Sequence, residues 1–222
     1  MMRHGVLFSV FALTSFSFGA DSVPDLKPQM LVKKEMMLED SFSKPLAADW
    51  KVAKGSWVVE NGSITGKELA ADMHGAVMRR DMVGDCYIIQ AEVQLNGTKA
   101  ISFSFNYAKG HLGRVRLTPK GVVLSKDDQD GKKGPDKAEV IGKLDFAFQQ
   151  ETWYTVMIEV HKKEMIVQLS DKVVYGSHEK LDQKTANFGL TVAGESAKYR
   201  NLKVWQAEID PTWEKKRAKF QK

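Results

Sequence analysis

The sequence has only one cysteine, Cys86, in 222 residues. A single thiol cannot close an intrachain disulfide, and it cannot supply a cysteine-rich zinc or iron–sulfur site. Beyond residue 20, no uncharged apolar run is long enough for a transmembrane helix, so we expect no integral membrane segment. The chain also lacks a Gly-x-Ser-x-Gly elbow, a phosphate-binding glycine-rich loop and a His-Glu-x-x-His motif. These absences argue against the enzyme classes that depend on those motifs.

The composition is that of a globular protein. Hydrophobic residues make up 43% of the chain and charged residues 27%, which excludes wholesale disorder and favours a single domain. The formal net charge is +5, and the last eight residues are rich in lysine. We expect this basic tail to be a solvated helix face. Nucleic acid is not an expected partner, because no strand face interleaves aromatic and basic residues.

The first twenty residues have the pattern of a secretory signal. Arg3 precedes an uncharged run over residues 5–19, and small residues at 17–20 lead to Asp21. The run is too short for a membrane span, and its organisation matches the charged region, apolar region and cleavage site of a signal peptide. We therefore predict a secreted or periplasmic protein with a signal peptide over residues 1–20.

Strand patterning dominates the rest of the chain. Apolar and polar residues alternate over 89–95, 101–107, 114–118, 154–161 and 188–192. Turn signals separate these runs, such as Asn61-Gly62, Asn96-Gly97 and Gly194. This pattern predicts an all-β fold, a two-sheet antiparallel jelly-roll sandwich with a short C-terminal helix. The expected segments are a leader at 21–35, a sandwich domain at 36–207 and a basic helix at 208–222.

Two short segments resemble a known family. Residues 55–66 read GSWVVENGSITG, and residues 197–204 read AKYRNLKV. They resemble the first hairpin and the last strand of the 3-keto-disaccharide hydrolase domain family. The resemblance implies a jelly roll of the concanavalin A-like lectin/glucanase type, found in exported bacterial proteins, and hydrolysis of glycosidic bonds, for example in 3-keto sugars. Both segments are structural in character, so they carry the fold more directly than the activity.

A polar strand face in the middle of the chain is the predicted ligand site. In a jelly roll one sheet face is concave, and ligands lie across it or at its loops. Arginine and asparagine suit sugar hydroxyls because they offer several fixed donors and acceptors. The alternatives are a plain solvated sheet face and, for the turn residue, an exposed loop. The predicted substrate-binding residues are Ser102, Ser104, Asn106, Arg116 and Glu195.

The chemistry that the resemblance implies needs a base and an electrophile. A keto group acidifies the neighbouring C–H, which permits elimination followed by addition of water. We predict His74 or His111 as the base, Arg114 as the group that stabilises the keto oxygen, and Asp72 as the residue that orients His74. For each histidine the alternative is a plain surface residue.

Two acidic motifs match known sites only in part. Asp128, Asp130 and Gly131 have calcium-loop spacing, but Lys126 stands where the first acidic ligand belongs, and no glutamate closes the loop. We expect a solvated, lysine-balanced turn and no cofactor, with calcium as the alternative. The segment 208–214 contains a Glu-x-Asp pair, the spacing needed by a glycosidase whose catalytic carboxylates share one face of a strand. Pro211 interrupts that strand, so we do not expect such a catalytic site here.

The sequence thus predicts an exported carbohydrate-active protein with a carbohydrate ligand, acting by hydrolysis of glycosides or 3-keto-glycosides. The alternative is a non-catalytic module of the same fold that binds carbohydrate or interacts with the cell envelope. The lack of a paired-carboxylate signature favours this alternative.

Overall fold

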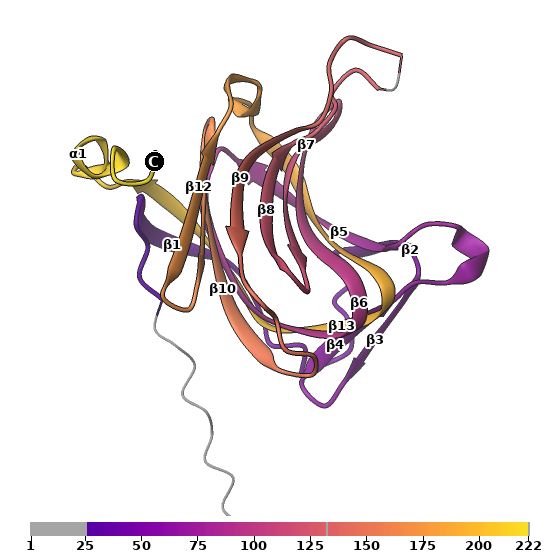
Figure 1. The fold of residues 1–222 in the computed structure, drawn as a ribbon. Coiled ribbons are helices and arrows are strands. Elements are labelled where there is room, and N and C mark those ends of the chain that lie inside the picture. The colour runs from indigo at the N-terminus through magenta and orange to yellow at the C-terminus, as the bar shows by residue number, and fades with distance from the viewer. Residues whose placement is uncertain (1–25, 132, 222) are drawn as a thin grey trace, which may run out of the picture.

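The structure, a computed structural model, describes residues 26–131 and 133–221, and the predicted signal peptide lies outside these ranges. The described chain forms one continuous antiparallel sheet of 13 strands (Figure 1). The strands are β1 (Leu31–Asp40), β2 (Trp50–Lys54), β3 (Ser56–Glu60), β4 (Ser63–Lys67), β5 (Ala76–Gly84), β6 (Cys86–Tyr107), β7 (Gly110–Thr118), β8 (Gly121–Lys126), β9 (Glu139–Asp145), β10 (Trp153–His161), β11 (Glu164–Leu169), β12 (Lys172–Ser177) and β13 (Thr185–Ile209). The remaining elements are the 3-10 turns η1 (Ala70–Asp72) and η2 (Glu179–Leu181) and the helix α1 (Trp213–Arg217).

Two long strands join the two layers of the fold. β6 has 22 residues and β13 has 25, and they pair along most of their length. The sequence predicts turns at Asn96-Gly97 and Gly194, and these predictions are wrong: both sites lie inside continuous strands. Gly97 and Gly194 have φ angles of 70° and 99°, and the register shifts where the two strands pass each other here. Such irregularities bend a strand instead of ending it.

The halves of β6 and β13 belong to different layers. Residues 86–94 of β6 pair with β10, which continues to β11 and β12, and the end of β13 pairs with β1. Residues 101–107 of β6 pair with β7, followed by β8 and β9, while the start of β13 pairs with β5 and then β2. This arrangement confirms the predicted antiparallel jelly roll (Figure 1).

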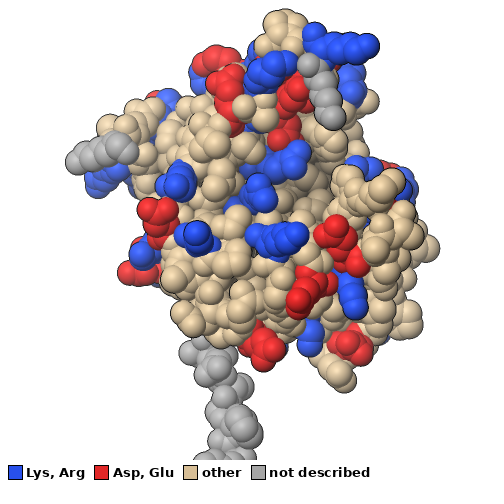
Figure 2. Space-filling model, turned by 45° about the vertical axis from the view of Figure 1, so that its right-hand side comes forward, with Lys and Arg blue, Asp and Glu red and all other residues tan. Residues whose placement is uncertain are grey.

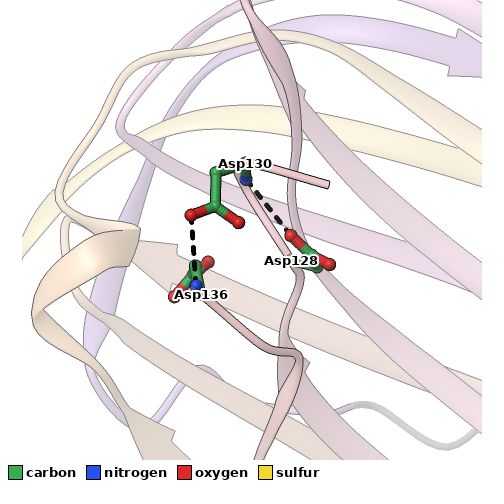
Figure 3. A group of neighbouring side chains, drawn as sticks. All are labelled: Asp128, Asp130 and Asp136. Carbon is green, nitrogen blue, oxygen red and sulfur yellow. Dashed lines mark hydrogen bonds between the residues drawn. The ribbon is translucent and has the colours of Figure 1, made fainter. Parts of the chain in front are cut away.

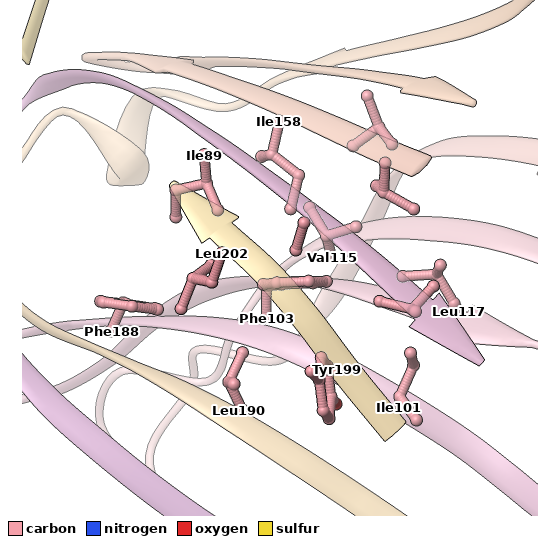
Figure 4. Close-up of a cluster of buried hydrophobic side chains, with 14 of the residues drawn as sticks. Ile89, Ile101, Phe103, Val115, Leu117, Ile158, Phe188, Leu190, Tyr199 and Leu202 are labelled. Atoms are coloured by element: carbon pink, nitrogen blue, oxygen red, sulfur yellow. The ribbon is translucent and has the colours of Figure 1, made fainter. Parts of the chain in front are cut away.

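The main core lies between the layers. The apolar sides of the alternating runs are buried as predicted, with Ile89, Phe103, Val115 and Ile158 at 0% exposure. Figure 4 shows these side chains with their neighbours. Each fully buried large apolar side chain contributes about 1.5–3 kcal/mol to folding. Tyr199, also in this cluster, donates its hydroxyl to the carbonyl of Thr191 at 2.9 Å, so its polar group is satisfied.

The hairpin of β3 and β4 has the predicted tight turn. Glu60 pairs with Ser63, and the two residues between them, Asn61 and Gly62, have φ angles of 49° and 69°. Both positive angles are what a type I′ turn requires, and the Asn-Gly pair provides them. Trp57 of this hairpin packs on Tyr199 of β13, with ring centroids 6.2 Å apart. The two segments that resemble the hydrolase family thus contact each other.

The chain ends cover the outer face of the first layer and form a second core. β1 begins at Leu31, before the predicted domain start at Met36. The carboxylate of Glu159 accepts hydrogen bonds from the backbone N–H groups of Gln29, Met30 and Leu31 at 2.7, 2.9 and 2.7 Å. This second core consists of Leu26, Met30, Leu31, Ile88, Met157, Ile166, Ala207 and Trp213.

The basic tail is also part of the fold. β13 extends to Ile209, beyond the predicted domain end at Ala207, and α1 has only five residues. Trp213 is fully buried, and Arg217 donates to the buried carboxylate of Glu164 at 2.7 Å. Lys215 and Lys219 are exposed, as the predicted solvated face requires, whereas Trp213 and Arg217 pack against the sheet. Within the described ranges, none of the helices has the length and apolar character that crossing a bilayer would require.

Candidate functional site

The polar face of the second layer is organised in cross-strand rows. In one row Arg79 of β5 pairs with Gly189 of β13, Gly189 with Ser104 of β6, and Ser104 with Arg114 of β7. In the adjacent row Thr191 pairs with Ser102, and Ser102 with Arg116. Directly opposed residues in a sheet share a face. The strand register therefore brings the predicted serines and arginines together, as the alternation of their sequence suggested.

A cleft of about 520 Å³ lies on this face. Ser102 and Thr191 of the polar rows line it, together with His74 and Gly75 from the segment before β5. The space-filling view in Figure 2 shows a hollowed face of the molecule on which several Lys and Arg side chains gather. The residues that line the cleft are His74, Gly75, Ala100, Ser102, Arg114, Arg116, Val123, Ser125, Asp127, Ala138, Val140, Thr191, Val192 and Ala193.

Arg114 is held in place by Asp127, a residue that the sequence analysis did not single out. Nε of Arg114 donates to Oδ1 of Asp127 at 2.8 Å, and Nη2 donates to Oδ2 at 2.8 Å. The Asp127 side chain is only 6% exposed, whereas that of Arg114 is 39% exposed. A two-point contact of this kind fixes the plane of the guanidinium group. Nη1 of Arg114 has no hydrogen-bond partner among the described residues and is open to a ligand.

Arg116 has neither a hydrogen bond nor an ion pair with the described residues. It is exposed and lines the cleft, two residues beyond Arg114 on the same face of β7. Its neighbour Ser102 is nearly buried, and the Ser102 hydroxyl likewise has no described partner. These two side chains provide free donors, and the hydroxyl also provides an acceptor. Both are polar groups of the cleft that are available to a ligand.

His111 ends a chain of hydrogen bonds at the edge of the same face. The amide of Asn106 donates to Oδ1 of Asn187 at 2.8 Å, so its own Oδ1 faces Nδ1 of His111 at 2.7 Å. Because an amide oxygen only accepts, Nδ1 carries the proton and Nε2 keeps a lone pair. Burial lowers the pKa of His111, and the charges of Asp127, Arg114, Arg79 and His74 also act on it. His111, His74 and Arg114 are therefore close enough to interact electrostatically.

His74 lines the cleft, but Asp72 does not orient it. Nδ1 of His74 lies 2.8 Å from the carbonyl oxygen of Gly75, which makes Nδ1 the donor and leaves Nε2 free. The carboxylate of Asp72 instead accepts a hydrogen bond from the backbone N–H of Gly55 at 2.6 Å and lies 3.8 Å from Nζ of Lys54. The predicted Asp72–His74 pairing is thus wrong, because the η1 turn directs the carboxylate towards the preceding hairpin.

Glu195 lies away from the cleft. It is exposed, and a Cβ atom placed on Gly97 would come within 2.2 Å of its carboxylate oxygen. Its side chain therefore lies over the bend of β6 instead of over the polar face. Glu195 is not among the residues that line the cleft.

The acidic loop beside the cleft brings three carboxylates together. Asp128, Asp130 and Asp136 each place an oxygen within 4.8 Å of the others (Figure 3). Asp136 is bound by the ammonium groups of Lys126, at 2.5 Å, and Lys180. These contacts hold the pKa of Asp136 well below its usual range. The chain's own lysines thus neutralise part of the cluster, and calcium at Asp128 and Asp130 remains the untested alternative to the predicted lysine-balanced turn.

The sequence analysis missed several residues of this face. Asn187 and Thr191 were visible as the polar positions of an alternating strand, but nothing in the sequence placed that strand beside 101–107. Arg79 follows three apolar residues, and its face became clear only from its pairing with Gly189. The sequence did contain a signal for Asp127. The tight turn after Thr118 sets the register of β7 and β8 and places residue 125 opposite residue 114, so that Asp127 follows two positions later on the same face.

Comparison with solved structures supports the fold. The sequence matches no protein-family model and no curated relative. A Bacillus subtilis protein of unknown function with a galectin-like fold aligns over 80% of this chain and 99% of its own, with a TM-score of 0.61 and 11% identity. The carbohydrate-binding module CBM66 of Bacillus subtilis aligns over 71% of this chain and 96% of its own, with a TM-score of 0.57 and 15% identity. The β-glucanase of Bacillus licheniformis aligns over 76% and 97%, with a TM-score of 0.57 and 6% identity.

At these identities the likeness shows a shared fold. The chain has a jelly-roll fold like those of these neighbours, and the comparisons agree with the predicted all-β class. The finer resemblance to the 3-keto-disaccharide hydrolase family stays a prediction.

Proposed function

We propose that this protein binds a saccharide in the cleft over β6, β7 and β13. The observation that carries the proposal is the pair of uncommitted polar groups, the Arg116 guanidinium and the Ser102 hydroxyl, in a cleft of about 520 Å³. Saccharide hydroxyls need several donors and acceptors in fixed positions, and a sheet floor holds them rigidly. The names of two structural neighbours, a carbohydrate-binding module and a β-glucanase, support the same ligand class.

Binding without paired-carboxylate hydrolysis fits the cleft best. A glycosidase of the usual kind places two carboxyl groups on either side of the scissile bond. Among the described residues that line the cleft, Asp127 alone carries a carboxylate, and Arg114 already binds both of its oxygens. We also propose that the protein is exported. The support for export is the signal-peptide pattern of residues 1–20, which lie outside the described ranges.

A second candidate function is hydrolysis of a 3-keto-glycoside, as the family resemblance implies. The supporting observation is that His74 and His111 both have Nδ1 next to a hydrogen-bond acceptor. Each neutral imidazole therefore presents Nε2 as a base. The base would remove the proton beside the ketone, and the glycosidic C–O bond would break to leave a C=C bond and release the second sugar, whose oxygen takes up a proton. Water would then add across the C=C bond. Nη1 of Arg114 is the donor available to the keto oxygen.

A calorimetric titration tests binding directly. The mature protein is titrated with a panel of oligosaccharides, including neutral glucans and fructans and their 3-keto derivatives. Arg116→Ala is the test variant, and Lys215→Ala is the control, since Lys215 is an exposed residue of α1 whose side chain makes no described hydrogen bond or ion pair. We expect Arg116→Ala to weaken binding by roughly 10- to 100-fold and Lys215→Ala to leave it unchanged. No binding to any member of the panel, or equal binding by both variants, would overturn the proposal.

A product assay separates the two candidates. Wild-type protein, His74→Gln and His111→Gln are incubated with a 3-keto-disaccharide, and released monosaccharide is measured by chromatography. Release that either substitution abolishes would establish the hydrolase. Binding without release would leave a binding module and remove the second candidate.

A further inference from the structure

The arginine row continues beyond the cleft. Arg79 lies in the same cross-strand row as Arg114 but three strands away, with Gly189 and Ser104 between them. With neighbouring strands about 4.8 Å apart, the two backbones are separated by about 14 Å. Arg79 lines a second hollow of about 400 Å³ together with Asn106, His111 and Asn187. The two hollows lie on one face of the sheet.

The floor between the two arginines is formed by small residues. Gly189 has no side chain, and a Cβ at this position would lie 2.8 Å from Oγ of Ser104 and 3.2 Å from Cγ of Arg79. These contacts also show that the Ser104 and Arg79 side chains leave the sheet on the same side as the missing Cβ. The row is therefore a shallow trough with a guanidinium group at each end.

The charge of this trough is not balanced. Arg79 makes no hydrogen bond or ion pair with any described residue, and the same holds for Arg116 in the adjacent row. Only Arg114 has a partner, Asp127. Other arginines of the described chain are paired: Arg80 binds Asp49, Arg200 binds Glu92, and Arg217 binds Glu164 and Glu214. Among the described residues, the two arginines without such a partner thus lie on one face, on either side of β6 and β13.

We propose that the ligand is an acidic saccharide, whose carboxylate or sulfate groups bind Arg79 and Arg116 while its sugar rings lie over Gly189, Ser104 and Ser102. This inference rests on the proposed function and specifies its substrate class. Arginine binds a carboxylate or sulfate through two parallel N–H donors, which a neutral sugar cannot match. The two arginines stand on strands three spacings apart, which favours a ligand of at least two sugar units over a monosaccharide.

The test uses ligands that differ only in charge. Tetragalacturonate is titrated against its fully methyl-esterified form, and sulfated dextran oligosaccharide against unmodified dextran oligosaccharide. The protein variants are wild type, Arg79→Ala, Arg116→Ala and Lys215→Ala, the last of which removes one positive charge at a distant site. Polyglutamate serves as a polyanion without sugar rings, and circular dichroism checks that every variant is folded.

We expect at least one acidic form to bind at least tenfold more tightly than its neutral partner. Arg79→Ala and Arg116→Ala should each remove most of this preference, Lys215→Ala should keep it, and added salt should weaken it. Equal binding of acidic and neutral forms would overturn the acidic-saccharide inference and leave the proposed function standing. Binding of polyglutamate as tightly as of the acidic sugars would also overturn it, since charge alone would then explain the affinity. Failure of every saccharide, neutral or acidic, would overturn the proposed function itself.

Discussion

Arg114 and Asp127 form a two-point ion pair at the wall of the cleft, with Nε and Nη2 each 2.8 Å from a carboxylate oxygen. The aspartate is nearly buried and the arginine is half exposed, so the pair both supports the loop after β8 and presents a guanidinium edge to the cleft. This relationship divides the arginines of the face into two kinds. Arg114 is structural as well as available to a ligand, whereas Arg79 and Arg116 have no other described partner.

Replacing Arg114 by alanine should therefore destabilise the protein. Loss of one partner of a buried pair costs about 3–5 kcal/mol, but water can reach the exposed side of this one, so we expect about 1–3 kcal/mol. Urea unfolding of Arg114→Ala, Arg114→Lys and the double variant Arg114→Ala/Asp127→Asn measures the effect. The double variant should be more stable than the single alanine variant, because it leaves no unpaired carboxylate. Arg116→Ala should change stability by less than about 0.5 kcal/mol. A similar loss in Arg114→Ala and Arg116→Ala would contradict this account of the pair.

Glu159 should anchor the N-terminal segment. Its carboxylate accepts three backbone N–H groups from residues 29–31, although burial raises its pKa. Glu159→Gln replaces one acceptor oxygen by a donor, and we expect a loss of about 1.5–3 kcal/mol. The same substitution should accelerate the hydrogen exchange of the Met30 and Leu31 backbone amides. The control is Glu208→Gln, because Glu208 forms an exposed pair with Lys34. Slow exchange at Met30 in Glu159→Gln would show that apolar packing alone holds the segment.

Trp213 should contribute stability without contributing to binding. It is fully buried in the second core, which shares no residue with the lining of the cleft. Trp213→Ala should cost about 3–5 kcal/mol in unfolding free energy, as expected for a large buried side chain. Under conditions in which the variant remains folded, its saccharide affinity should equal that of wild type. An affinity loss in the folded variant would place part of the binding site on the tail.

The two partly buried histidines should make the protein less stable in mild acid. Burial lowers the pKa values of His111 and His161, so both stay neutral in the folded state at a pH where the unfolded chain takes up protons. No effect is expected well above pH 6.5, and stability should fall as the pH drops through 6.5 towards the folded pKa values. Unfolding free energies at pH 7.5 and 5.5 measure this change. His111→Gln and His161→Gln should each reduce the difference in unfolding free energy between the two pH values. If both variants show the same difference as wild type, these histidines are not the source of the acid sensitivity.

The alternating segments were enough to predict the strands and their buried sides. Residues such as Ile89, Phe103 and Val115 face the core because a period of two places every second residue on one side. The bends at Gly97 and Gly194 were misread as turns, since a positive φ serves a turn and a bulge equally well. The second core was missed because the residues that cover Met157 and Glu159 come from the two chain ends, which local patterns do not connect.

The candidate site was predictable only where its residues come from consecutive strands. Ser102, Ser104, Arg114 and Arg116 could be assigned to one polar face from β6 and β7 alone, because these strands are consecutive. Arg79 and Gly189 could not, since they reach the same row through pairings between segments more than 80 residues apart. The role of Asp72 was misjudged because adjacency in sequence suggested a contact with His74, whereas the turn between them separates the side chains.

The most direct test of the central claim, that a saccharide binds over β6, β7 and β13, is chemical-shift mapping. Backbone amide shifts of the labelled protein are followed by NMR as the tightest-binding oligosaccharide from the titrations is added. The account predicts that the largest shifts occur at residues 102–106, 114–116 and 187–191, with little change in α1 and in the second core. Shifts confined to the opposite layer, around Glu92 and Asn201, or to the C-terminal helix would contradict it.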